Sequence, residues 1–348
     1  MVSHWKEKDI DQQLVDWAKG QDINNRCQRT IKKDVAFSGR SIVNGKDVRL
    51  ILRPAEPDSG ILFLRRDLSE KNPIKVSFEN LARTSIYISL ASGVSKKRRL
   101  QRFFMKNAHH KWFKFLEHLM IRLPRNNISL IEHILAICYL FLDNLIIEVE
   151  DDNVPYLSFC EFFERIKKGE IIEQESPRRI YTLKEPFFFS GKDGQEIRIE
   201  PSEELVVDYS IDFSLKCEAV GKQHYSIKIT PEAVLKNIAF ARSIFFTEWK
   251  VFITRIYKKV DYTEANLDMI LAADKSGYLN KKENAPRYLR DGRSFELVRH
   301  KIGDLLGELS FLEGFLKAKI TVKRGGHSFT LLALEKLKNS GLLTLNNE

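Results

Sequence analysis

The order in which strand-like and helix-like stretches follow one another most constrains how this chain can fold. Between Gln28 and Leu90 the sequence is rich in alternating patterns and short apolar runs typical of strands. A long apolar stretch at 128–142 then predicts a buried helix. The second half repeats this order, with strand patterns at 180–229 followed by a helix that opens at Pro231. Strands followed by helices, twice over, predict an α+β fold made of two units of similar plan.

Turn residues and helix caps locate the individual elements. Asn44-Gly45 is a favoured hairpin turn, and Ser129 lies three residues before Glu132, as in a capping box at the start of the buried helix. Further strands are expected at 48–52, 60–64, 82–91, 145–149, 180–190, 196–200, 205–213, 224–229 and 318–323. Helices are expected at 10–18, 158–168, 231–244, 294–313 and 328–339.

The join between the two units is expected near 175–179, which contains Ser176-Pro177. The chain of 348 residues is long enough to build two separate cores. We therefore expect an N-terminal extension at 1–27, a first domain at 28–176 and a second domain at 177–348.

Composition argues against several classes of protein. The first 25 residues are charged throughout and lack the apolar core of an export signal. The most apolar stretch, 128–149, is interrupted by Glu132, His133, Asp143 and Asn144, which argues against a membrane-spanning helix. The 4 cysteines are scattered without a Cys-x-x-Cys pair, so neither a disulfide scaffold nor a cysteine zinc site is expected. Free thiols fit a reducing cytoplasm.

The net charge of +10 is concentrated in one segment. Residues 96–123 contain nine Lys or Arg residues and a single acidic residue, Glu117. Apolar residues in this segment, Trp112 and Phe115 among them, fall at helical spacing. A basic amphipathic helix of this kind can lie on an anionic membrane surface, or it can pack on the protein with a solvated basic face. Nucleic acid is not an expected partner, because no recognised nucleic-acid module surrounds the segment.

Three short polar clusters contain the histidines that could support catalysis. His300 and Asp304 are four residues apart, so on a helix they share one face and can bind one divalent ion, although a surface hydrogen bond is the common alternative. Glu132-His133 could add a second imidazole and a carboxylate beside the metal-bound water. Two imidazoles, one carboxylate and an open position are typical of zinc hydrolases, and the same ligands also suit non-haem iron.

His327 follows Gly325-Gly326 and precedes a predicted helix. Its ring could project from a loop and protonate a leaving amine near a metal-bound nucleophile. A histidine in solvent at the start of a helix is the simpler interpretation. The sequence contains no phosphate-loop lysine motif, no dinucleotide glycine fingerprint and no nucleophilic serine elbow.

Many short passages lie in a particular order along the chain. They are Gln28-Arg-Thr-Ile-Lys32, Ser38-Gly39, Asn44-Gly45-Lys46, Leu52-Arg-Pro-Ala55, Gly60, Arg65-Arg-Asp-Leu68, Glu132-His133, Asn144, Ile147-Glu-Val149, Ala241-Arg242, Val298-Arg-His-Lys301, Asp304, Gly307 and Gly326-His327. In this order they resemble the UDP-3-O-acyl-N-acetylglucosamine deacetylases, the zinc amidases of lipid A synthesis. The resemblance covers about 28–337, nearly the whole chain.

The resemblance implies a fold of two β-α-α-β layered sandwich domains with the active site between them. It implies that zinc is bound by His133, His300 and Asp304. It further implies Glu132 as the general base, and His327 as the group that stabilises the oxyanion and protonates the departing amine. The other implied site residues are Ser243, in place of a threonine that assists the oxyanion; Glu308, in place of an aspartate that supports the catalytic histidine; Lys301, as a substrate contact; and Ile244, Phe245 and Phe246, beside the acyl chain.

The chain also departs from the pattern of the family. Val43 replaces a histidine, Ser158-Phe159-Cys160 replaces an Asp-Gly-Ser signature, Ile244-Phe245 replaces an aromatic-glycine pair, and a double glycine expected at 267–270 is absent. The basic segment 95–125 is an insertion relative to the family. The catalytic set is thus kept while its substrate-facing surroundings change, which points to an altered substrate or a weakened enzyme.

These observations together predict a zinc-dependent N-deacetylase of an acylated UDP-amino-sugar. The alternative is a divergent paralogue that binds lipid or a partner protein and has weak or no activity. The expected location is the cytoplasm, with peripheral contact to the inner membrane through 95–125.

Overall fold

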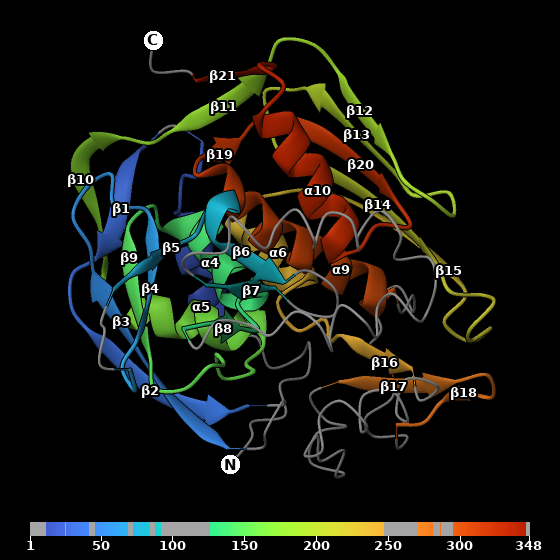
Figure 1. Cartoon of the computed structure of the whole chain (residues 1–348), viewed down its shortest axis with the longest axis horizontal. Coiled ribbons are helices and arrows are strands. Elements are labelled where there is room, and N and C mark those ends of the chain that lie inside the picture. The colour runs from blue at the N-terminus through green and yellow to red at the C-terminus, as the bar shows by residue number, and fades with distance from the viewer. Residues whose placement is uncertain are drawn as a thin grey trace.

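Two five-stranded sheets of the same plan lie on opposite sides of a layer of helices (Figure 1). The computed structural model describes residues 12–24, 26–41, 46–68, 72–83, 88–91, 126–246, 270–280, 286 and 295–345. The first sheet contains, in spatial order, β2 (Val35–Arg40), β3 (Asp47–Pro54), β9 (Leu145–Val149), β4 (Ile61–Arg65) and β5 (Ile74–Lys75). The second contains β12 (Phe187–Ser190), β13 (Glu196–Pro201), β20 (Ala318–Lys323), β14 (Val206–Asp212) and β15 (Lys222–Lys228).

The two sheets share their strand directions as well as their order. In each, the third and fourth strands are parallel, and all other neighbours are antiparallel. In each, the central strand is the last to enter and has one helix before it and one after it. The predicted α+β fold of two similar units is therefore confirmed.

The helices of the two units meet in the middle of the molecule. The first unit supplies α4 (Glu132–Phe141) and α5 (Phe159–Lys168), and the second supplies α9 (Glu296–Leu309) and α10 (His327–Lys338) (Figure 1). All ten residues of α4 are buried, which explains its uniformly apolar sequence. Shorter helices are α1 (Gln12–Lys19), α6 (Pro231–Asn237) and the 3-10 turns η2 (Phe78–Asn80) and η5 (Ser310–Leu312).

Small sheets complete each unit at equivalent places. β6 (Leu81–Arg83), β7 (Ser89–Leu90) and β8 (Ile128–Ser129) precede α4, and β16 (Ile244–Phe246), β17 (Leu271–Asp274) and β18 (Gly277–Tyr278) precede α9. β1 (Cys27–Ile31) pairs with β10 (Ile171–Pro177), and β11 (Ile180–Leu183) lies between β19 (Phe315–Leu316) and β21 (Leu343–Leu345). The domain boundary at 176/177 stays a prediction.

Several local predictions were wrong in instructive ways. Residues 82–91 are not one strand, because β6 and β7 pair with each other as antiparallel strands. The helix that opens at Pro231 ends at Asn237, and Ile244 begins a strand instead. Ser129 does not cap α4: it lies in β8, its hydroxyl bonds that of Ser89 at 2.8 Å, and the N-cap residue is Ile131. The capping-box explanation of Glu132 therefore fails.

Other local predictions hold. β9 and β20 have the expected bounds, and α5 begins with a full capping box between Ser158 and Glu161. The Asn44-Gly45 turn lies outside the described residues, although β2 and β3 on either side form the expected antiparallel pair. The basic segment 95–125 also lies outside them.

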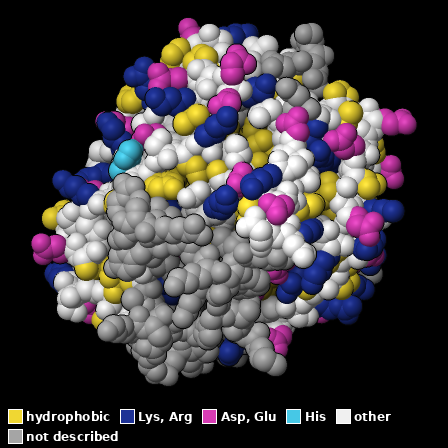
Figure 2. Space-filling model, turned by 180° about the vertical axis from the view of Figure 1, so that it is seen from behind, with side chains coloured by type: hydrophobic (Ala, Val, Ile, Leu, Met, Phe, Trp, Pro, Cys, Tyr) yellow, Lys and Arg dark blue, Asp and Glu magenta, His cyan; other side chains and the backbone are white. Residues whose placement is uncertain are grey.

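The described surface is mixed in charge. Figure 2 shows basic and acidic side chains interspersed over the described part of one face. No helix within the described ranges is both long and apolar enough to cross a membrane.

A glycine lets the central helices of the two units approach closely. A Cβ atom built on Gly307 of α9 would overlap the backbone oxygen of Glu132 in α4 and would lie 3.2 Å from its Cα. Neither group is a flexible side-chain end that could move aside. The crossing of α4 and α9 thus depends on a hydrogen atom at this position.

We expect Gly307→Ala to destabilise the protein by about 1–3 kcal/mol or more, because the added methyl group forces two buried helices apart. Urea unfolding measures this as a lower midpoint. Gly20→Ala is the matched control, since its Cβ would lie at an ordinary 3.5 Å from the Trp17 oxygen. A midpoint for Gly307→Ala equal to that of the control would contradict the proposed close crossing.

Candidate metal centre

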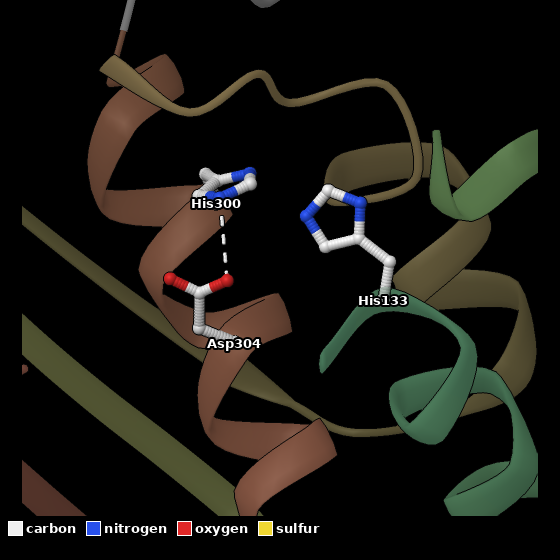
Figure 3. A group of neighbouring side chains, drawn as sticks. All are labelled: His133, His300 and Asp304. Atoms are coloured by element: carbon white, nitrogen blue, oxygen red, sulfur yellow. Dashed lines mark ion pairs between the residues drawn. The ribbon is translucent and has the colours of Figure 1, made fainter. Parts of the chain in front are cut away.

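Three buried polar side chains from the two central helices converge on one point (Figure 3). His133 is the second residue of α4, and His300 and Asp304 lie one turn apart on α9. Their exposed fractions are 6%, 2% and 3%, and one ligand atom from each lies within 4.8 Å of the others. The structure therefore brings together the three residues that sequence reasoning selected as metal ligands.

Each imidazole is oriented by a backbone carbonyl. The His133 Nδ1 donates to the Leu157 oxygen at 2.9 Å, and the His300 Nδ1 donates to the Ala241 oxygen at 2.9 Å. A carbonyl oxygen can only accept, so Nδ1 of each ring has the proton. In the neutral rings, Nε2 is left with the lone pair that a metal ion needs.

His300 and Asp304 face each other at short distance in a buried place. The His300 Nε2 lies 3.2 Å from Asp304 Oδ1, and this buried oxygen has no hydrogen-bond donor. A carboxylate oxygen can only accept, so a His300 ring with a proton on Nδ1 alone would leave both of these buried atoms without a donor. Either a second ring proton or a metal ion must lie between them, and a metal ion would satisfy His133 as well.

Local electrostatics favour the protonation states that bind metal. Burial, reinforced by His300, lowers the pKa of His133 to about 4, so this ring is neutral at pH 7. Burial alone would raise the pKa of Asp304, but His300, Lys301 and His327 together hold it well below its usual value. Neutral imidazole and ionised carboxylate are the ligand forms that zinc binds. The residues present therefore fit a zinc ion.

Glu132 lies beside this cluster with its carboxyl group buried. The Ile88 amide donates to its Oε2 at 3.3 Å, and the residue is 6% exposed. Burial raises the pKa of Glu132, and the nearby His327 partly offsets this effect. A carboxylate with a raised pKa is suited to accept a proton.

His327 forms a pair with Glu308 next to the cluster. Its Nδ1 lies 2.8 Å from Glu308 Oε1, and its Nε2 lies 3.7 Å from Asp304 Oδ2. Burial would lower the pKa of His327, but Asp304 and the hydrogen bond to Glu308 raise it above its ordinary value. His300, Asp304 and Glu308 are spaced four residues apart, so one face of α9 presents all three.

The other predicted site residues differ in burial and in their contacts. Lys301 Nζ donates to Asp304 Oδ2 at 2.7 Å. Ser243, just before β16, is half-buried and accepts from the Leu271 amide at 2.8 Å through its backbone oxygen. Phe246 is buried against Phe213, with ring centroids 5.1 Å apart. Ile244 packs on the core, and the Phe245 side chain lies outside the described residues. The catalytic and substrate-binding roles of these residues stay predictions.

Sequence reasoning missed a buried ion pair that holds the loop beside His300. The Arg242 amide and its Nε donate to Glu296 Oε1 at 3.0 Å and 2.8 Å. This pair ties the residue after Ala241 to the first turn of α9 and so fixes the carbonyl that orients His300. Ala241-Arg242 was noticed only as part of a family resemblance, and no signal in the sequence singles out Glu296.

Sequence reasoning also missed the aromatic side chains that surround the imidazoles. The rings of Tyr156 and Phe159 lie 5.0 Å and 4.4 Å from the ring of His133. Phe159 lies in the passage 158–160 that replaces a family signature and in the predicted helix 158–168, but no feature of the sequence placed either ring beside His133.

Comparison with known proteins decides the family. A family model described as UDP-3-O-acyl N-acetylglycosamine deacetylase (LpxC) matches residues 28–120 and 105–339. The chain belongs to this family. The two matched ranges overlap at 105–120, within the basic segment 95–125.

Relatives match over most of their length. UDP-3-O-acyl-N-acetylglucosamine deacetylase of Oleidesulfovibrio alaskensis is 28% identical over 313 residues, covering 86% of this chain and 85% of the relative. The enzyme of that name from Wolinella succinogenes is 28% identical over 316 residues, covering 89% and 90%. That of Methylococcus capsulatus is 29% identical over 304 residues, covering 86% of each chain.

The lowered pKa of His133 predicts how the stability of the metal-free protein depends on pH. Between its ordinary pKa of 6.5 and the folded value of about 4, the unfolded chain binds a proton at His133 that the folded chain excludes. The free energy of unfolding should therefore fall as the pH drops through this window, by up to about 1.4 kcal/mol per pH unit. Urea unfolding in excess chelator at several pH values gives the slope of the free energy of unfolding against pH. The difference in this slope between wild type and His133→Gln measures the contribution of His133.

Comparing wild type with His133→Gln removes the contributions that other titrating groups make to the pH dependence of stability in both proteins. His327, whose pKa is raised, adds stability below 6.5 and loses it as the pH rises through its folded value, in both proteins. His224→Gln is the control, because His224 is exposed on β15. If His133→Gln keeps the full slope of the wild type, burial of a neutral ring at this position is wrong.

Proposed function

We propose that this chain is a zinc-dependent N-deacetylase of an acylated N-acetyl amino-sugar nucleotide, UDP-3-O-acyl-N-acetylglucosamine or a related compound, in lipid A type synthesis. The observation that supports this most directly is the buried convergence of His300 Nε2 and the Asp304 carboxylate, 3.2 Å apart, with His133 beside them. The family model and the names of the relatives supply the substrate class.

His133, His300 and Asp304 would hold the zinc ion, which would supply Lewis-acid chemistry by acidifying water and polarising the amide carbonyl. Glu132, buried next to these ligands, accepts a proton from the attacking water. His327 then gives a proton to the nitrogen as the carbon–nitrogen bond breaks, which yields acetate and a free amine. Glu308 holds the His327 ring through Nδ1, so that Nε2 faces the cluster.

Further residues would act on the substrate. We infer that the Ser243 hydroxyl assists the developing oxyanion, and that Lys301 contacts the substrate from its place beside Asp304. Ile244, Phe245 and Phe246 would flank the acyl chain. The replaced passages at 158–160 and 244–245 then suggest another acyl chain or another N-acetylated sugar as the preferred substrate.

Glu132→Ala and His327→Ala should each retain stoichiometric zinc while turnover falls by about 10²–10⁴-fold, because each removes a proton carrier and no ligand. Acetate release from a panel of acylated UDP-amino-sugars, with metal analysis of the same samples, measures both effects. His224→Ala is the control, since the exposed His224 pairs with Asp208 on the outside of the second sheet.

Two outcomes would overturn this proposal. Full turnover by either variant would remove Glu132 or His327 from the mechanism. Zinc binding by the wild type without acetate release from any substrate would favour the alternative, a paralogue that binds lipid or a partner protein.

We also infer that the chain acts in the cytoplasm and touches the inner membrane through the basic segment 95–125. On the face shown in Figure 2, the described Lys and Arg side chains are interspersed with Asp and Glu, so the charge excess of this segment is the best candidate for contact with anionic lipid.

Replacing Lys96, Lys97, Arg98 and Arg99 by Ser should weaken binding to vesicles that contain phosphatidylglycerol by at least about tenfold, because each basic residue near the surface contributes about 1 kcal/mol. Co-sedimentation measures the effect. The matched control replaces four dispersed exposed lysines, namely Lys192, Lys222, Lys236 and Lys319. Equal binding by the two variants would exclude a specific role for the segment.

A further inference from the structure

One phenyl ring forms a wall against both imidazoles of the candidate metal centre. Phe159, the first residue of α5, is 1% exposed. Its ring centroid lies 4.4 Å from that of His133 and 5.8 Å from that of His300. The imidazole centroids are 5.2 Å apart. The three rings are therefore mutual neighbours, and Phe159 touches a ligand from each half of the molecule.

A glycine on α9 makes room for this ring. A Cβ atom built on Gly303 would overlap Phe159 Cζ and lie 2.6 Å from Cε2. Gly303 lies between His300 and Asp304 in the turn that presents both ligands. Glycine in the interior of a helix is unfavourable by about 1 kcal/mol relative to alanine, so its presence here needs a reason. The ring of Phe159 supplies one, since any side chain at 303 would push it off the imidazoles.

The start of α5 is itself held in place on both sides. The Leu157 oxygen accepts from His133 Nδ1, and the Cys160 amide donates to the Ala239 oxygen at 3.0 Å. Ser158 and Glu161 form a complete capping box around the first turn. Phe159 thus projects from a backbone that is fixed relative to His133 and to the loop that orients His300.

We propose that Phe159 is a positioning residue of the zinc site, whose ring, seated in the space left by Gly303, fixes the two imidazole ligands at metal-binding separation and keeps water from their outer faces. The inference rests on the proposed function, because it takes His133, His300 and Asp304 as the ligands. An imidazole held by one hydrogen bond through Nδ1 can still tilt about its Cβ. A ring packed against it, tilted by 42° at His133 and by 51° at His300, limits that freedom before the metal arrives.

Phe159 lies where the chain departs from the sequence pattern of its family. Phe159 is the central residue of the Ser-Phe-Cys passage that replaces an Asp-Gly-Ser signature of the family. In this chain, therefore, an apolar wall that depends on Gly303 supports the ligands.

The decisive comparison uses two phenylalanines of the same helix. Phe163 is also 1% exposed, and its ring packs on Trp17 and Phe141, with centroids 5.6 Å and 4.5 Å away. Phe159→Ala and Phe163→Ala remove the same group from the same helix and should both lower stability. Only Phe159→Ala should lower zinc affinity, by about 10–100-fold. Chelator competition on the folded proteins measures the affinity, and Phe159→Leu should recover most of it.

A second pair of variants tests the fit between the ring and the glycine. Gly303→Ala should weaken zinc binding by about tenfold or more and change the visible spectrum of the cobalt-substituted protein, because the methyl group displaces the ring from the ligands. Adding Phe159→Leu, which removes the overlapping ring atoms, should restore part of the affinity and of the spectrum. This recovery would be a non-additive coupling between two contacting residues.

The outcomes separate the two proposals. A wild-type chain that binds no zinc would overturn the proposed function. A wild type that binds zinc, with equal affinity losses in Phe159→Ala and Phe163→Ala, would overturn the positioning role and leave the function standing. Should Phe159→Ala fail to fold, an additive loss in Gly303→Ala combined with Phe159→Leu would overturn the role just as well.

Discussion

The close crossing of α4 and α9 is the contact on which the rest of the molecule depends. Each helix comes from a different half of the chain, and the absence of a side chain at Gly307 lets α9 approach the backbone of Glu132. His133 follows directly in α4, and His300 and Asp304 lie within two turns of Gly307 on α9. If the two helices lay farther apart, His133 on α4 would be separated from His300 and Asp304 on α9.

That crossing also concentrates polar groups in a buried place, where each needs a hydrogen-bond partner. Backbone carbonyls satisfy one nitrogen of each imidazole, and Glu308 does the same for His327. Among the buried side-chain atoms left without a hydrogen-bond partner is Asp304 Oδ1, which lies 3.2 Å from His300 Nε2. A buried oxygen left without a donor costs stability, and a cation held by His133, His300 and Asp304 would offset that cost.

Equivalent elements of the two halves contribute different residues to the candidate site. α4 and α9 enter the layer of helices at corresponding points of their units, yet α4 contributes one ligand with a carboxylate beside it, and α9 contributes two ligands and Glu308. The helices that follow also differ, since α5 presents Phe159 to the imidazoles and α10 begins with His327. Two similar scaffolds thus build one asymmetric site.

The sequence by itself determined the two α+β units, most element positions and the identities of the three candidate ligands, because periodicity, caps and the four-residue spacing of His300 and Asp304 are local properties. It misassigned Ser129 as the cap of α4, since a capping box and a buried carboxylate that accepts from a distant backbone amide look alike over four residues. Only the tertiary structure decided that His133 meets His300, that Glu296 clamps Arg242, and that Phe159 occupies the space at Gly303. Those contacts join residues far apart in the chain, and their geometry comes from packing of whole helices rather than from any local pattern.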